Sequence, residues 1–136
     1  QVATTGTDAD WIVKVVDVFP NDEPETKEVQ PYLKMSNYHM MVRSEVMRGR
    51  FRNSFVNPEP FVAKEKTPVN VKLQDVFHTF KKGHKIQIQV QSTWFPLIDL
   101  NPQTFVPNIF YAKPEDFKKQ THRVYSDSAI EFTVLK

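Results

Sequence analysis

The stretch KIQIQVQSTWFPLIDLNPQ, residues 85–103, decides the fold of this chain. Its first seven residues alternate isoleucine or valine with lysine or glutamine, which is the period of two that a β-strand imposes on its side chains. The rest breaks into a proline-containing loop that still carries tryptophan, phenylalanine, leucine and isoleucine. Loops are usually polar, so the pattern predicts a strand followed by a loop with an unusual amount of apolar surface.

The period of two recurs along the chain. Turn-forming residues, mostly proline, asparagine, aspartate and glycine, separate the segments that show it. Short helical turns are expected only at 73–79 and 113–117. Many short strands without a long helix predict an all-β protein, a jelly-roll-type β-sandwich. The expected strands lie at 11–19, 38–43, 47–55, 69–73, 86–90, 105–111, 121–125 and 130–134.

Composition sets the limits within which a function can be sought. The 136 residues, 40% hydrophobic and 25% charged, predict one globular domain over 1–136. A net charge of +2, from 18 basic and 16 acidic residues, gives no sign of a nucleic-acid partner. The chain has no cysteine, which excludes disulfides, thiolate nucleophiles and cysteine-based zinc sites. No apolar run approaches the roughly 18 residues of a membrane span, so no membrane partner is expected.

Catalytic motifs are missing from the sequence. No G-x-S-x-G nucleophile elbow occurs. His39, His78, His84 and His122 are scattered, with no paired spacing typical of zinc ligands. His84 follows a Lys-Gly turn and is expected to face solvent. We therefore expect no catalytic residue, no cofactor and no metal ligand.

Two groups of charged residues remain open to interpretation. Asp8 and Asp10, two positions apart, could bind a cation or cap a loop, and the sequence does not decide between them. Arg48, Arg50 and Arg52 alternate along an expected strand, which places them on its outer face. We expect this basic stripe to form surface or interdomain salt bridges rather than to bind phosphate or RNA.

The two tryptophans differ in their surroundings. Trp11 opens a core-like strand and is expected to be packed. Trp94 enters the apolar loop, which could dock on another domain, fold back over the open end of the sandwich, or act as the stacking platform of a carbohydrate-binding module. The candidate interdomain contact residues are Trp94, Phe95, Leu97, Asp99 and Asn101.

Four segments in order resemble one family. They are TTGTDADWIVKVVDVFP, YHMMVRSEVMRGRFRNSF, VNVKLQDVFHTFKKGHKIQIQVQSTWFPLIDLNPQTF and THRVYSDSAIEFTVL, and together they cover most of the chain. They are similar to the C-terminal β-domain of the X-Pro dipeptidyl-peptidase superfamily. That superfamily includes cocaine esterase, α-amino-acid ester hydrolases and glutaryl-aminocephalosporanic acid acylases. Leu100 departs from the pattern, since an arginine is common at that position.

The resemblance implies a galactose-binding-domain-like jelly roll that carries no catalytic triad. It also implies a partner, an α/β-hydrolase domain of the same polypeptide that has the Ser-Asp-His triad and a helical cap. The chain would then be the C-terminal segment of a serine acylase, ester hydrolase or dipeptidyl-peptidase-like enzyme. It would support the hydrolase domain, and its first strand or strands would be missing. Self-association and the compartment, cytoplasmic or exported, stay open.

Overall fold

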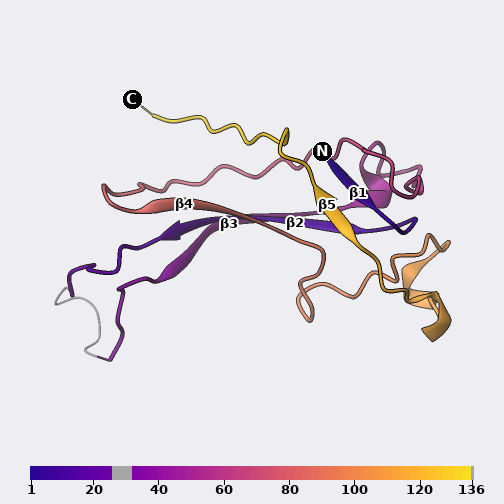
Figure 1. Cartoon of the computed structure of the whole chain (residues 1–136), viewed down its shortest axis with the longest axis horizontal. Coiled ribbons are helices and arrows are strands. Elements are labelled where there is room, and N and C mark those ends of the chain that lie inside the picture. Colours follow the sequence, from indigo (N-terminus) through magenta and orange to yellow (C-terminus); the bar gives the residue numbers. More distant parts are fainter. Residues whose placement is uncertain (26–31, 136) are drawn as a thin grey trace. The chain divides into compact units, whose positions relative to one another are not determined.

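The computed structural model describes residues 1–25 and 32–135 (Figure 1). Helix in this part of the chain is confined to three short 3-10 turns, so the all-β prediction is confirmed. The jelly-roll arrangement of the strands stays a prediction. The elements are β1 (Val2–Thr4), β2 (Asp10–Val18), β3 (His39–Arg48), η1 (Gly49–Phe51), β4 (Lys85–Gln91), η2 (Ile109–Tyr111), η3 (Pro114–Asp116) and β5 (His122–Val124).

The chain divides into two compact units, each built from separated segments. The first unit consists of Gln1–Trp11, Met47–Asn70 and Ser92–Lys136. The second consists of Ile12–Val46 and Val71–Gln91. The expectation of one sandwich domain over 1–136 stays a prediction.

The second unit is organised by a three-stranded sheet in the order β3-β2-β4 (Figure 1). β2 and β4 run antiparallel, with Ile12 opposite Gln91 and Val18 opposite Lys85. β-branched residues fill the central strand, as expected for a strand covered on both faces. Ile12, Val15 and Val16 are buried. The strand expected at 11–19 is thus confirmed.

β4 confirms the strand expected at 86–90, and its two faces differ. The apolar side chains of Ile86, Ile88 and Val90 are all exposed. The intervening Gln87 and Gln89 are partly buried. The alternation therefore predicts the strand correctly, while its apolar row faces outward.

The first unit is organised around the antiparallel pair β1 and β5, in which Ala3 lies opposite Arg123. Its hydrophobic core joins Val2, Ala9, Trp11 and Phe61. The rings of Trp11 and Phe61 meet edge to face, with centroids 6.5 Å apart, which is a favourable aromatic geometry. The prediction that Trp11 is packed is confirmed.

The strand expected at 47–55 is wrong, because β3 ends at Arg48 and η1 follows. Gly49 shows the reason. Its backbone N–H donates to the carbonyl of Ala9 at 2.8 Å. A Cβ at Gly49 would lie 2.3 Å from the Phe61 ring and 2.6 Å from the Ala9 oxygen, so only glycine permits this close approach.

The remaining expected strands and helical turns have different outcomes. Segments 69–73 and 130–134 form no strand, since neither has a ladder partner among the described residues. Segment 105–111 turns into η2, where the Asn108 side chain accepts the Phe110 N–H at 3.0 Å. The turn expected at 73–79 is not helical. The one at 113–117 is confirmed as η3, with Pro114 at its start.

Candidate functional site

The apolar loop after β4 forms a turn in the first unit. The N–H of Ile98 donates to the carbonyl of Trp94 at 3.0 Å and closes the turn. Phe95 and Leu97 project from it and are 64% and 69% exposed. Trp94 itself is partly buried. The turn therefore presents two large apolar side chains to solvent.

The polar residues that follow in the same loop bind other parts of the first unit. The Asn101 amide donates to Asp10 Oδ1 at 2.9 Å, and its oxygen accepts the Gln103 N–H at 2.7 Å. Asp99 accepts a hydrogen bond from Arg48. Of the five predicted contact residues, Phe95 and Leu97 are exposed, Trp94 is partly buried, and Asp99 and Asn101 hold the turn in place.

Asp10 lies at the centre of these anchoring contacts. Its carboxylate is almost fully buried, and Arg48 Nη1 lies 3.7 Å from its Oδ2. Burial, and to a smaller extent the nearby Asp8 and Asp99 carboxylates, raise the pKa of Asp10 to about 6. The Asn101 hydrogen bond and the Arg48 charge oppose this rise in pKa. Arg48 is thereby shared between Asp10 and Asp99.

Asp8 forms a second, drier ion pair in the same unit. Arg50 Nε and Nη2 both lie 2.8 Å from Asp8 Oδ2, and neither side chain has more than 5% exposure. Arg50 also donates to the Val106 carbonyl at 2.8 Å and lies over the Phe105 ring. Asp8 Oδ1 accepts the Ala9 N–H at 2.9 Å. Capping and charge pairing are thus combined at Asp8.

The expected solvated stripe of arginines does not form, because β3 ends before Arg50. Arg50 turns inward to Asp8. Arg52 donates to the carbonyls of Gly49, Glu59 and Pro60 at 2.9–3.0 Å. Its guanidinium lies 4.4 Å from the centre of the Phe61 ring. All three arginines therefore make contacts within the first unit, while an interdomain role stays a prediction.

A buried cluster in the second unit has no counterpart in the sequence-based expectations. Asp17 Oδ2 lies 2.9 Å from His78 Nε2, and Asp17 Oδ1 lies 2.8 Å from His84 Nδ1. His84 Nε2 is also 3.4 Å from Glu23. The expectation that His84 faces solvent is wrong, since its side chain is only 2% exposed. Because Asp17 precedes His78 by 61 residues and His84 by 67 residues, no local sequence motif predicts the cluster.

The side chains of this cluster hold one another in place through hydrogen bonds. An ionised Asp17 can only accept hydrogen bonds, so His78 and His84 donate to it. His122 bonds Gln103 at 2.9 Å and packs on Trp11.

Within residues 1–25 and 32–135, no three histidine, aspartate or glutamate side chains are arranged to hold a metal ion. No helix in that same part is long and apolar enough to cross a membrane.

Known proteins match this chain in sequence and in structure. Cocaine esterase from Rhodococcus sp. (strain MB1 Bresler) is 29% identical over 103 residues, which are 76% of this chain and 15% of the esterase. An aminopeptidase from a marine-sediment Thaumarchaeota archaeon superposes with a TM-score of 0.83 at 44% identity. An α-amino acid ester hydrolase superposes with a TM-score of 0.79 at 43% identity.

The structural matches cover most of this chain but only a small part of each relative. The matched parts span 91% and 93% of this chain, but only 19% and 20% of the aminopeptidase and the ester hydrolase. The chain therefore corresponds to a small part of each relative. The sequence model of one family, the X-Pro dipeptidyl-peptidase C-terminal non-catalytic domain, matches residues 1–134. The chain belongs to this family.

Proposed function

We propose that this chain braces the α/β-hydrolase domain of the same polypeptide, on which it packs through the turn at residues 94–101. One observation carries the proposal. Phe95 and Leu97 are exposed on a turn whose Asp99 and Asn101 are fastened to Arg48 and Asp10. A fixed backbone that presents apolar side chains loses little conformational entropy when it docks.

The size of the effect fits a domain contact. Fully burying a leucine or phenylalanine side chain contributes about 1.5–3 kcal/mol. Phe95 and Leu97 together would therefore add several kcal/mol to docking if the partner covers both. In the enzyme that we propose, a serine of the hydrolase domain attacks an ester or amide carbonyl, the C–O or C–N bond breaks, and the alcohol or amine leaves with the serine proton, so that an acyl-enzyme remains. No residue of this chain makes or breaks a bond in that reaction.

The outward row of Ile86, Ile88 and Val90 supports a second part of the proposal. Among the described residues β4 has no partner on its outer edge, and an edge strand that also carries exposed apolar side chains is prone to pair with another chain. We propose that a strand from outside residues 1–136 pairs with this edge in the complete enzyme and that its side chains pack beside the apolar row. Left uncovered, the row would favour self-association.

The test uses the natural full-length protein. Phe95→Asp combined with Leu97→Asp should lower its thermal midpoint and its kcat/KM for an ester substrate, because two charges would enter the domain contact. Val62→Asp is the matched control, since Val62 lies in the same unit and is also 64% exposed. Limited proteolysis should separate the two domains of the double variant sooner. Wild-type stability, activity and protease resistance in that variant would rule out the proposed contact.

A further inference from the structure

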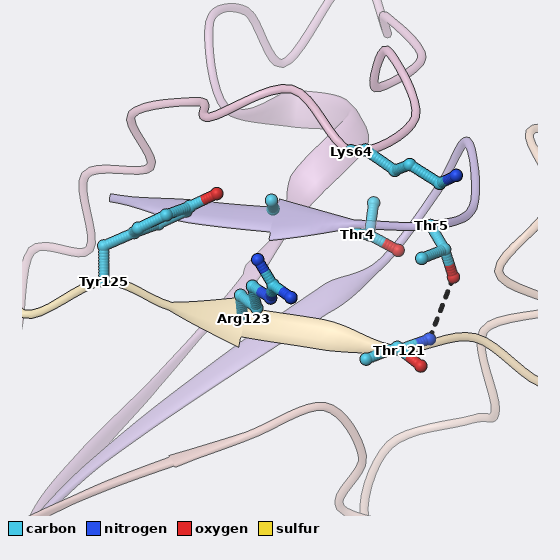
Figure 2. A pocket seen from close by; sticks show the side chains of 7 residues that line it. Thr4, Thr5, Lys64, Thr121, Arg123 and Tyr125 are labelled. Atoms are coloured by element: carbon cyan, nitrogen blue, oxygen red, sulfur yellow. Dashed lines mark hydrogen bonds between the residues drawn. The ribbon is translucent and has the colours of Figure 1, made fainter.

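A polar pocket of about 450 Å³ opens beside the β1–β5 pair in the first unit (Figure 2). The segment at Lys64 completes its wall. This volume lies within the range of small-molecule sites, which is roughly 300–1,000 Å³. The lining is polar except for the methyl group of Ala3 and the ring of Tyr125.

The strand period explains how this lining forms. Thr121, Arg123 and Tyr125 are two residues apart, so they share one face of β5 and its flanks. Ala3 lies opposite Arg123 in the ladder, and its small side chain leaves room beside the guanidinium. His122, on the other face, packs against Trp11 in the core. The alternation therefore separates a binding face from a packing face.

Lys64 reaches the pocket through an unusual backbone conformation. Its φ of 67° lies in the left-handed region, which a residue with a side chain adopts at some cost. The Lys64 N–H donates to the carbonyl of Thr4 at 2.6 Å, and this bond holds the segment against β1. The Lys64 side chain lies above the end of β1, with its ammonium on the side of Thr5 (Figure 2).

Two positive charges line the pocket and no acidic side chain does. Neither Lys64 nor Arg123 forms an ion pair within the described part of the chain. The neighbouring Lys66 shows the contrast, because its ammonium lies 2.5 Å from the Asp127 carboxylate. Unopposed cations in a concave site attract an anion.

Hydroxyl groups add donors around these two charges. Thr5 Oγ1 is already committed, since it donates to Gln120 at 2.6 Å and accepts the Thr121 N–H at 2.9 Å (Figure 2). That pair fastens β1 to the start of β5. Thr121 and Tyr125 also line the pocket, and their hydroxyls are the donors that remain for a ligand. Lys66 lies 4.9 Å from the centre of the Tyr125 ring and steadies its position.

We propose that this pocket binds a small organic phosphate. A guanidinium matches the oxygens of a phosphate group, and an ammonium adds a second full charge. A tetrahedral anion offers acceptors in several directions, as donors from two strands and a loop require. The phosphate would occupy only part of the volume, so an organic substituent fits beside Ala3 and Tyr125. This binding function does not depend on the hydrolase-bracing role.

Isothermal titration of the natural full-length protein tests the pocket, with glucose 6-phosphate, inorganic phosphate and glucose as probes at constant ionic strength. Glucose 6-phosphate should bind saturably, and more tightly than inorganic phosphate. Arg123→Gln should weaken it by about tenfold or more, as expected for the loss of a charged hydrogen bond. Lys64→Asn removes the ammonium and should weaken binding similarly. Asparagine is chosen as the replacement because it tolerates the positive φ at this position. Lys119→Gln removes an exposed charge outside the pocket and should leave the Kd unchanged.

Thermal melts first establish that each variant is folded, and Lys64→Asn carries the test if Arg123→Gln is not. The absence of saturable binding to the wild-type protein would overturn the proposal. So would equal Kd values in the two pocket variants and the Lys119 control. If inorganic phosphate bound as tightly as glucose 6-phosphate, the organic part of the ligand would be rejected.

Discussion

In the first unit the buried Asp8 carboxylate meets the guanidinium of Arg50, whereas in the second unit Asp17 lies between the imidazoles of His78 and His84. Both carboxylates belong to the interior, yet their partners differ in kind. A guanidinium stays charged at every pH at which a protein folds, while a histidine is charged only when protonated. The first unit therefore stabilises its carboxylate with a permanent charge. The second uses hydrogen bonds that neutral imidazoles can also donate.

The largest expected effect comes from removing the permanent charge. Arg50→Met should lower the free energy of unfolding by about 3–5 kcal/mol, because Asp8 would remain buried and unpaired. The double variant Asp8→Asn with Arg50→Met should recover much of this loss, since asparagine keeps the bond to the Ala9 N–H. Urea denaturation measures both. Arg123→Met, which removes an exposed arginine in the same unit, is the control.

The contrast between the units rests on this result. If Arg50→Met lowered the free energy of unfolding no more than Arg123→Met does, the buried ion pair would contribute nothing to stability. The two units would then not differ in how they stabilise a buried carboxylate.

Asp10 provides the next largest effect, through pH. Its folded pKa of about 6 lies above the ordinary value of 3.8 for an aspartate, so the folded state holds the proton more tightly. The stability from this group is fully present below pH 3.8 and is lost as the pH rises through 6. At about 1.4 kcal/mol per pKa unit, the loss is at most about 3 kcal/mol.

Asp10→Asn should remove this component. Urea midpoints of the wild type and the variant, measured at pH 4, 5, 6 and 7, should be most alike at pH 4, where a protonated Asp10 resembles asparagine, and the wild type should fall relative to the variant as the pH rises. Parallel curves would show that Asp10 titrates equally in the folded and unfolded chain.

A smaller loss is expected from the histidine-based cluster. His84→Leu removes one of two donors to Asp17, and His78 still bonds the other oxygen. The free energy of unfolding should fall by about 1–3 kcal/mol, the typical cost of an unsatisfied buried polar group. His39→Leu, at an exposed position of β3, should change it little. Equal effects of the two substitutions would deny the cluster any structural role.

The smallest effect tests whether burial explains the contrast. Lys66 and Asp127 lie 2.5 Å apart, and this contact lowers the pKa of the Asp127 carboxyl. Both side chains are exposed, so water and salt screen their attraction. Lys66→Gln should leave the urea midpoint unchanged within error. A shift comparable to that of His84→Leu would mean that distance, and not burial, determines the strength of these pairs.

Periodicity predicted the strands that pair with one another within the chain. β2 and β4 were predictable because both are rich in β-branched residues and β4 alternates with a period of two, although the apolar row of β4 is exposed. Segment 47–55 was misread, since its alternation continues through Gly49 although the chain turns there to meet Ala9 and Phe61. That contact lies between positions about 40 and 12 residues apart, and a local pattern does not contain it.

The candidate site was predictable to a similar degree. The apolar character of Phe95 and Leu97 was visible in the sequence, and the structure exposes both. The inward direction of Arg50 was not visible, because it follows from the end of β3. Asp17 with its two histidines was missed for another reason. Its members lie on different segments, and only the pairing of β2 with β4 and the loop before it brings them together.

The arginine contacts of the first unit have a consequence for how the chain is cross-linked. Arg50 joins positions 42 residues apart, and Arg48 joins positions 51 residues apart. Small domains often close such long loops with disulfides, but this chain has no cysteine. Its ionic cross-links need no oxidant to form, and no reductant opens them. The redox state of the surroundings therefore does not determine whether these two cross-links form.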